Sequence, residues 1–108
     1  MYNYAKRVEE LHVFEKAYNI SLSIHKISLE FPKIEQYALA NQIRRASKLV
    51  CANLAEGFAK QAGSRREFRH FILTSMGSSD EMQIWIRYCK DLLYITNEQE
   101  KLFSNEYQ

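Results

Sequence analysis

Residues that interrupt helices are scarce in this chain, and their scarcity limits the folds that it can adopt. Glycine occurs three times and proline once in 108 residues, whereas a protein built from short strands needs such residues at many of its turns. Between these few positions run long segments with the hydrophobic spacing of helices. We therefore predict one all-α domain over residues 1–108, an antiparallel, up-and-down four-helix bundle with a short or truncated fourth helix.

The first predicted helix, from about Val8 to Phe31, carries two apolar stripes rather than one. With 100° between successive residues, the first stripe contains Val13, Ala17, Ile20, Ile24, Ile27 and Phe31. The second stripe contains Leu11, Phe14, Tyr18, Leu22, His25 and Leu29. Because an ordinary surface helix buries a single face, we expect this helix to lie deep in the bundle or to present one face to another subunit.

The second predicted helix, from Lys33 to Gln61, follows Pro32, which disfavours a helical conformation at the residue before it. Its predicted inner stripe contains Leu39, Gln42, Ala46, Leu49, Asn53 and Glu56. Polar groups buried on such a stripe need partners. We interpret them as a hydrogen-bonded network, inside or between subunits, that contains Gln42, Asn53, Glu56, Ser78 and Glu81, with Arg45 as a further candidate. In the alternative interpretation, part of this set lines a solvated groove for a ligand or phosphates.

The third predicted helix has the clearest heptad pattern, which runs through Phe68, Phe71, Ser75, Ser78, Met82, Trp85, Cys89 and Leu92. Gly77 in its interior costs about 1 kcal/mol relative to alanine, so we expect a neighbouring backbone to approach it closely. Ser64 with Glu67, and Thr96 with Gln99, have the spacing of capping boxes. They mark the starts of the third helix and of a last helix that extends to about Tyr107.

The sequence lacks a recognisable catalytic or metal-binding pattern. His12, His25 and His70 do not have the spacing that places two metal ligands on one helical face, and no glycine-rich phosphate loop is present. Cys51 and Cys89 fall inside helical patterns, where we interpret them as small buried hydrophobic residues. We predict a protein that is not an enzyme and has no metal or cofactor.

Positive charge is concentrated in the middle of the chain. The whole sequence has a net charge of +2, but residues 41–70 contain seven basic and two acidic side chains. Such a block can attract the phosphates of RNA or DNA, and the candidate contacts are Arg44, Arg45, Lys48, Lys60, Arg65, Arg66 and Arg69. In the alternative, a protein-interaction or scaffolding oligomer, the arginines form pairs between subunits. For Arg44 and Arg45 both interpretations stay open.

The chain shows no sign of membrane insertion. No apolar run approaches the roughly 18 residues of a membrane span, and the sequence MYNYAKRVEE lacks the apolar region of a signal peptide. We therefore expect a cytoplasmic protein without a membrane partner.

Two blocks of sequence are familiar: Phe31-Pro32-Lys33-x-Glu35-x-Tyr37 and Ala52-Asn53-Leu54-Ala55-Glu56-Gly57. With Gln42, Arg44, Arg45, Glu67, Phe68 and Glu81, they make the chain resemble the four-helix bundle proteins encoded in intervening sequences of bacterial 23S ribosomal RNA genes. This family is similar to the accessory variability protein of diversity-generating retroelements. The resemblance implies a barrel-like homopentamer of four-helix subunits that is associated with RNA.

The resemblance also implies partners for this chain: further copies of itself, RNA or DNA, and a partner protein such as the reverse transcriptase of the retroelement relative. Many relatives carry proline at the position of Cys51. We therefore expect the second helix to be straighter here than in those relatives.

Overall fold

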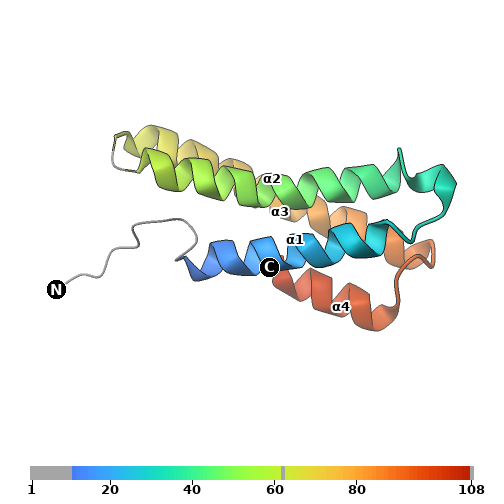
Figure 1. Cartoon of the computed structure of the whole chain (residues 1–108). Coiled ribbons are helices and arrows are strands. Elements are labelled where there is room, and N and C mark those ends of the chain that lie inside the picture. Colours follow the sequence, from blue (N-terminus) through green and yellow to red (C-terminus); the bar gives the residue numbers. More distant parts are fainter. Residues whose placement is uncertain (1–10, 62, 108) are drawn as a thin grey trace.

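The computed structural model describes residues 11–61 and 63–107, which form four α-helices and one short 3-10 helix (Figure 1). Helix α1 spans His12–Ser28, α2 spans Leu39–Lys60, α3 spans Arg65–Asp91 and α4 spans Asn97–Glu106, while the 3-10 helix η2 spans Lys33–Glu35. No strand occurs in the described ranges. The predicted all-α four-helix bundle with a short last helix is confirmed.

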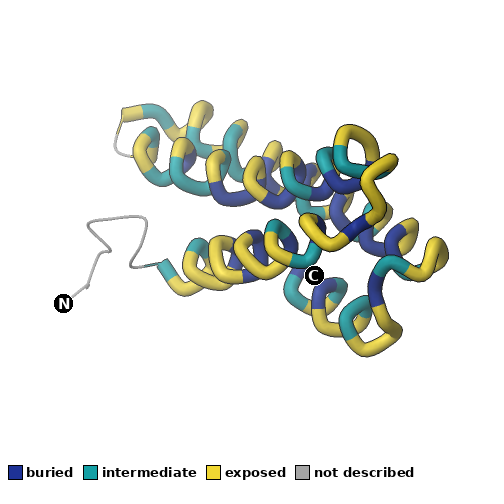
Figure 2. The backbone as a smooth tube through the Cα atoms, turned by 45° about the vertical axis from the view of Figure 1, so that its right-hand side comes forward, coloured by how far each residue is buried: buried dark blue, intermediate teal, exposed yellow. Residues whose placement is uncertain are grey.

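Successive helices run in opposite directions along the molecule (Figure 1). The most extensive contact joins α2 and α3, while α1 packs on α2, and α4 contacts both α3 and α1. All four helices contribute to one core, for example through Ile24, Ile43, Met82 and Phe103. Burial thins out toward the turn between α2 and α3 (Figure 2), where none of residues 65–74 is buried. Among the described residues, this end of the bundle is therefore the least covered.

Helix α1 is shorter than predicted because side chains take over its last carbonyl groups. It ends at Ser28 instead of Phe31, and the predicted start at Val8 lies outside the described residues. Gln36 donates hydrogen bonds from Nε2 to the carbonyl of Ser28 (2.9 Å) and to that of Phe31 (3.0 Å). These bonds satisfy carbonyls that a helix end leaves without partners, and Pro32 prevents the helix from continuing.

The second predicted helix is divided in two, so its expected start at Lys33 is wrong. Residues 33–35 form η2, and α2 begins only at Leu39. Ala38, with φ −120° and ψ −108°, lies outside the helical region and separates them. The side chain of Glu35 accepts a 2.7 Å hydrogen bond from Tyr94 Oη, which ties this turn to the one between α3 and α4. From Leu39 onward α2 is continuous through Cys51. Its expected straightness relative to relatives with proline at this position stays a prediction.

The buried face of α2 is rotated from the predicted one. The helix buries Leu39, Ala40, Ile43, Ala46, Ser47, Val50, Cys51 and Gly57. Only Leu39 and Ala46 belong to the predicted stripe, and Gln42, Leu49 and Glu56 are exposed. The predicted stripe placed two amides and a carboxylate inward, whereas the observed face buries apolar and small residues. This face avoids the cost of burying unpaired polar groups.

The predictions for α3 and α4 agree better with the structure. Helix α3 buries Ser75, Ser78, Met82 and Cys89 of the predicted heptad, although Leu92 is exposed. Ser75 Oγ donates a 2.9 Å hydrogen bond to the carbonyl of Val50, so the small residues allow α2 to approach. The Thr96–Gln99 capping box is present with both of its hydrogen bonds. At the start of α3, Ser64 Oγ accepts the backbone N–H of Glu67.

Candidate nucleic-acid interface

Arg44 holds the turn between α1 and α2 together and is not free to bind a phosphate. Its Nη1 donates to Ser28 Oγ (2.8 Å) and Gln36 Oε1 (3.1 Å), and its Nη2 donates to the Gln36 carbonyl (2.8 Å). The guanidinium therefore lies by the C-terminal turn of α1, where positive charge is favourable. We remove Arg44 from the candidate phosphate contacts, because its planar donor groups are occupied within the subunit.

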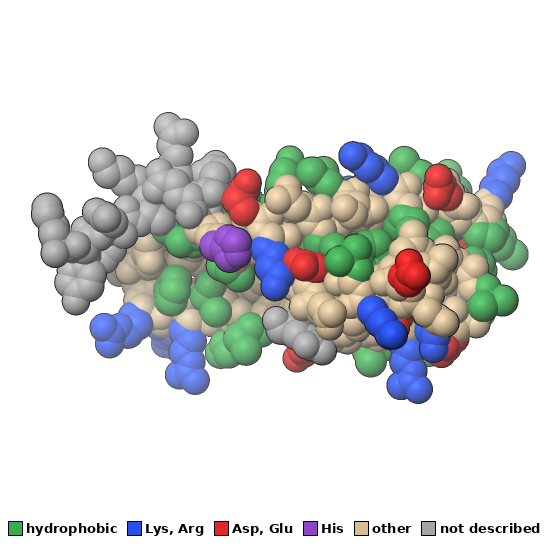
Figure 3. All heavy atoms as spheres, turned by 90° about the horizontal axis from the view of Figure 1, so that it is seen from below, with side chains coloured by type: hydrophobic (Ala, Val, Ile, Leu, Met, Phe, Trp, Pro, Cys, Tyr) green, Lys and Arg blue, Asp and Glu red, His purple; other side chains and the backbone are tan. Residues whose placement is uncertain are grey.

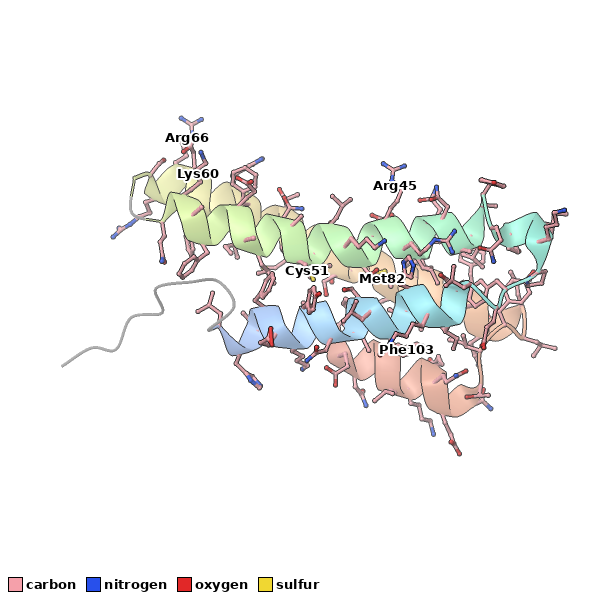
Figure 4. All side chains as sticks on the ribbon, in the orientation of Figure 1. Arg45, Cys51, Lys60, Arg66, Met82 and Phe103 are labelled. Atoms are coloured by element: carbon pink, nitrogen blue, oxygen red, sulfur yellow. The ribbon has the colours of Figure 1, made fainter. Side chains whose placement is uncertain are left out.

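Four of the other candidates gather where α2 ends and α3 begins, and we call Lys60, Arg65, Arg66 and Arg69 the basic end cluster. Arg65, Arg66 and Arg69 are exposed and Lys60 is half-buried. Figure 4 shows Lys60 and Arg66 pointing to the side of the hairpin that faces away from α1 and α4. Figure 3 shows Lys and Arg side chains projecting at this end of the molecule. The hairpin thus presents positive charge on its least covered part.

The basic end cluster is electrostatically unfavourable in the free subunit. None of its members forms an ion pair with an acidic residue in the described ranges, where the ion pairs are Lys16–Glu106, Arg87–Asp91 and Lys90–Asp91. Arg65 and Arg69 are four residues apart on one helix, a spacing at which like charges repel by about 0.2–0.5 kcal/mol. Arg65 and Arg66 also occupy the positive end of the α3 dipole. A bound anion would relieve both penalties.

Arg45 and Lys48 lie apart from this cluster. Arg45 is exposed and points to the same outer side as Lys60 and Arg66 (Figure 4), but fifteen residues of helix place it roughly 22 Å from Lys60. Lys48 Nζ lies 3.2 Å from His25 Nδ1 on α1, and its side chain is exposed. The structure therefore separates the seven predicted contacts into an end cluster of four, two outlying side chains of α2, and Arg44 in the turn.

The predicted polar network does not form inside the subunit. Gln42, Glu56 and Glu81 are exposed, and Ser78 is the one buried member. Asn53 Nδ2 donates to the Leu49 carbonyl of its own helix (2.9 Å). Glu81 accepts a 2.8 Å bond from Trp85 Nε1 one turn further along α3. The interpretation of these residues as a contact between subunits stays a prediction.

Sequence reasoning missed the polar residues that connect the helices. Ser28 and Gln36 hold Arg44 between α1, the turn after it, and α2. Within α2, the fully buried Ser47 donates to the carbonyl of Arg44 (3.1 Å). Glu35 and Tyr94 meet across 59 residues of sequence. The pairing of Glu35 with Tyr94 had no local signal. The turn regularities that describe Asn, Asp, Ser and Thr side chains do not extend to glutamine, so Gln36 had no local signal either.

Both cysteines are buried and unpaired, as the interpretation of small hydrophobic residues requires. Burial raises the pKa of the Cys89 thiol to about 12, and the nearby negative charge of Glu35 adds to this effect. Burial also raises the pKa of Cys51. Neither thiol therefore forms a thiolate near neutral pH. In residues 11–61 and 63–107, no group of three His, Cys, Asp or Glu side chains is placed to hold a metal ion.

Comparison with known proteins identifies the family of this chain. The model of the family described as "23S rRNA-intervening sequence protein" matches residues 9–108. The chain belongs to this family. A crystal structure of a protein of unknown function from the S23 ribosomal protein family of Bacteroides thetaiotaomicron is similar, with a TM-score of 0.77 and 23% sequence identity. The similar region covers 88% of this chain and 84% of that one, so the two proteins share the fold.

Among proteins with curated descriptions, none matches the chain significantly. The family membership and the similar crystal structure therefore establish the fold. Within the described part of the chain, no helix is both long and apolar enough to cross a membrane.

Proposed function

We propose that this protein is a homo-oligomer without enzymatic activity that binds structured RNA through the basic end cluster. The observation that carries the proposal is that Lys60, Arg65, Arg66 and Arg69 lie together on the least covered end of the bundle without an acidic partner among the described residues. Lys and Arg side chains that contact phosphates release counterions from the nucleic acid, which drives binding at low salt. Arg45, which points to the same outer side, extends the surface along α2, whereas Lys48 lies by His25 of α1 and is an outlying candidate.

The family name supports RNA as the nucleic acid, since it describes proteins of intervening sequences in 23S rRNA. Phe58, Phe68 and Phe71 lie next to the cluster in sequence but are half-buried, so the exposed side chains of the cluster offer mainly charge rather than rings for stacking on unpaired bases. We therefore propose contacts to the backbone of double-stranded or folded RNA, which proteins recognise largely by shape. The expected cytoplasmic location agrees with such a role.

Apolar residues on the surface support the oligomer. On α1, the second predicted stripe contains exposed Tyr18, Leu22 and Leu29, so one subunit leaves this face of the helix largely uncovered. Ile34 within η2 and Tyr37 just after it are 85% and 95% exposed, and Tyr37 belongs to a block that carries the family resemblance. Contiguous exposed apolar surface commonly marks an interface. The resemblance implies a pentamer, in which five weak basic clusters would act together through avidity.

A scaffolding oligomer with no nucleic-acid role is the second candidate, and the same apolar surface favours it. In that case Arg45 would pair with an acidic residue of another copy, such as Glu56 or Glu81, both of which are exposed. The two candidates share the oligomer and differ in the role of the basic end cluster.

The direct test measures the binding of a fluorescently labelled RNA hairpin by anisotropy at 50 and 200 mM salt. For the unmodified protein we expect affinity to fall about a hundredfold or more over this range, because the slope of about −0.9 per phosphate contact gives that loss for four contacts. The double variant Arg65→Glu with Arg66→Glu should bind at least tenfold more weakly at 50 mM salt, while its circular dichroism stays helical.

A matched control reverses two exposed charges elsewhere, Arg87→Glu on α3 and Lys101→Glu on α4. This control changes the net charge by the same amount and should retain most of the affinity. If both double variants lose affinity equally, general charge explains the binding and the end cluster is not the site. Undetectable binding at 50 mM salt would leave the scaffolding oligomer as the better proposal.

A further inference from the structure

His70 lies among the side chains of the basic end cluster. It directly follows Arg69 on α3 and comes one helical turn after Arg66, a spacing that places two side chains on the same face of a helix. Its side chain is exposed. Lysine and arginine stay charged at neutral pH, whereas histidine ordinarily changes its charge between pH 5 and 8. The surface around the cluster therefore contains one group whose charge depends on pH in the physiological range.

The imidazole ring of His70 is ordered without the use of its nitrogen atoms. It packs against the ring of Phe71 in a T-shaped arrangement, with 5.2 Å between the ring centroids. The backbone carbonyl of His70 accepts a 2.8 Å hydrogen bond from Thr74 Oγ1, but neither ring nitrogen forms a hydrogen bond or an ion pair within the described ranges. Both nitrogens are thus available to a ligand.

The other two histidines have different surroundings. His25 Nδ1 lies 3.2 Å from Lys48 Nζ, so a proton added to that nitrogen would face an ammonium group. His12 is exposed at the first residue of α1 and does not belong to the α2–α3 hairpin that carries the cluster. His70 is therefore the histidine that the fold places in the proposed RNA site.

The charges around His70 are mainly positive. Helix α2 packs on this part of α3, since Gly57 lies beside Ile72. The charged side chains in this part of the two helices are Arg65, Arg66, Glu67 and Arg69 of α3, and Glu56 and Lys60 of α2. Neither carboxylate forms an ion pair with His70 in residues 11–61 and 63–107. A proton on His70 adds to an excess of positive charge in the free subunit, whereas an RNA phosphate bound there would attract that proton.

We propose that His70 is a further RNA contact of this site and that its protonation strengthens binding as the pH falls. This inference rests on the proposed function of the basic end cluster. A protonated imidazole donates hydrogen bonds from both nitrogens and can form a charge-assisted bond to a phosphate oxygen. The neutral ring carries no charge that could replace a counterion of the RNA. RNA binding and proton uptake by His70 therefore favour each other.

The test measures the affinity of the full chain for the labelled RNA hairpin at pH 6.0 and pH 8.0, both at 50 mM salt. We expect about fivefold tighter binding at pH 6.0, which is the upper range for one exposed charge pair. His70→Gln should remove most of this difference, because glutamine donates hydrogen bonds but cannot gain a proton. His70→Lys should bind equally well at both pH values, and at pH 8.0 more tightly than the unmodified protein.

His12→Gln is the matched control, because it removes an exposed histidine outside the hairpin, and it should keep the full pH dependence. Equal affinities of the unmodified protein at the two pH values, or a difference that His70→Gln leaves unchanged, would overturn the role of His70. Either result, together with binding that Arg65→Glu with Arg66→Glu weakens, would leave the proposed RNA site intact. Absence of binding at both pH values would overturn the inference and the proposed function together.

Discussion

Arg44 Nη1 donates a 2.8 Å hydrogen bond to Ser28 Oγ, which ties α2 to the last turn of α1. The same hydroxyl donates to the carbonyl of His25 (2.7 Å), and Arg44 Nη2 donates to the carbonyl of Gln36 (2.8 Å). One guanidinium thus joins α1, the turn that follows it, and α2. A residue from the most basic part of the sequence stabilises the fold, while Arg65, Arg66 and Arg69 in the first turns of α3 remain exposed.

Arg44→Ala should lower the free energy of unfolding by about 2 kcal/mol, because it removes charge-assisted bonds from partly buried acceptors. Arg44→Lys should recover only part of this loss, since an ammonium group cannot reproduce the planar set of donors. Urea denaturation measures both changes. The control Arg69→Ala, at an exposed position, should stay within about 0.5 kcal/mol of the unmodified protein. Equal losses for Arg44→Ala and Arg69→Ala would refute the role given to Arg44.

Leu22→Lys should lower the particle mass measured by light scattering. Leu22 lies on the second apolar stripe of α1 and is exposed in the subunit, so a charge there would cost little in a monomer but much inside an interface. Asn19→Lys, one turn earlier at an exposed polar position, is the control and should leave the mass unchanged. If the mass of Leu22→Lys is also unchanged, this stripe is not a contact between copies.

In the scaffolding alternative, Arg45→Ala should also lower the particle mass. Arg45 is exposed and has no ion-pair partner within the described ranges, so its loss would affect the assembly through a partner on another copy. The same light-scattering measurement decides this point. An unchanged mass would leave Arg45 available for RNA.

Gly77→Ala should raise the free energy of unfolding by up to about 1 kcal/mol, the difference in helix propensity. The close approach predicted at Gly77 is absent within the subunit, because a Cβ atom there meets nothing within 4 Å. At Gly57 the added atom would lie 3.0 Å from Ile72 Cδ1, so Gly57→Ala should gain less. Thermal unfolding compares the two variants. A fall in stability together with a lower mass for Gly77→Ala would indicate that another copy approaches this position.

Unfolding should become easier as the pH rises above about 9. The pKa of Cys89 is raised from its ordinary value of 9.0 to about 12, first by burial and then by the charge of Glu35. The folded state therefore holds this proton more tightly than the unfolded state. Its contribution to stability is complete below pH 9 and is lost as the pH rises toward 12. The slope is at most about 1.4 kcal/mol per pH unit for one group.

Cys89→Ala should make the decline between pH 9 and pH 10.5 shallower, although the variant is less stable at every pH because it leaves a small cavity. Burial also raises the pKa of the Tyr107 hydroxyl, and that group acts in the same direction and remains in the variant. Urea denaturation at several pH values, with a reducing agent present, measures the slope. An identical slope in both proteins would show that the Cys89 thiol does not titrate as described.

The sequence predicted the elements of this fold more reliably than their faces. The heptad from Phe68 to Cys89 placed α3 correctly, because its apolar and small residues repeat over many turns. In α2 the pattern failed. Several small residues, such as Ala40, Ala46 and Ser47, fit a buried or an exposed face almost equally well, so the spacing of the residues did not select one face of the helix. Contact with α3 selected the face of Ile43 and Val50, because burying Gln42 and Glu56 would leave polar groups without partners.

For the basic residues, the sequence showed a segment and not a surface. The sequence by itself determined an all-α chain, a short last helix, buried cysteines and a basic middle segment, since composition and helical periodicity depend on neighbours a few residues away. The tertiary structure decided which basic residues are available. It bonded Arg44 to Ser28 and Gln36, and it left Arg65, Arg66 and Arg69 exposed at the least covered end. The physical reason is that packing determines which hydrogen-bond acceptors lie near a charged side chain. Ser28 and Arg44 are distant in the sequence and meet only in the folded chain.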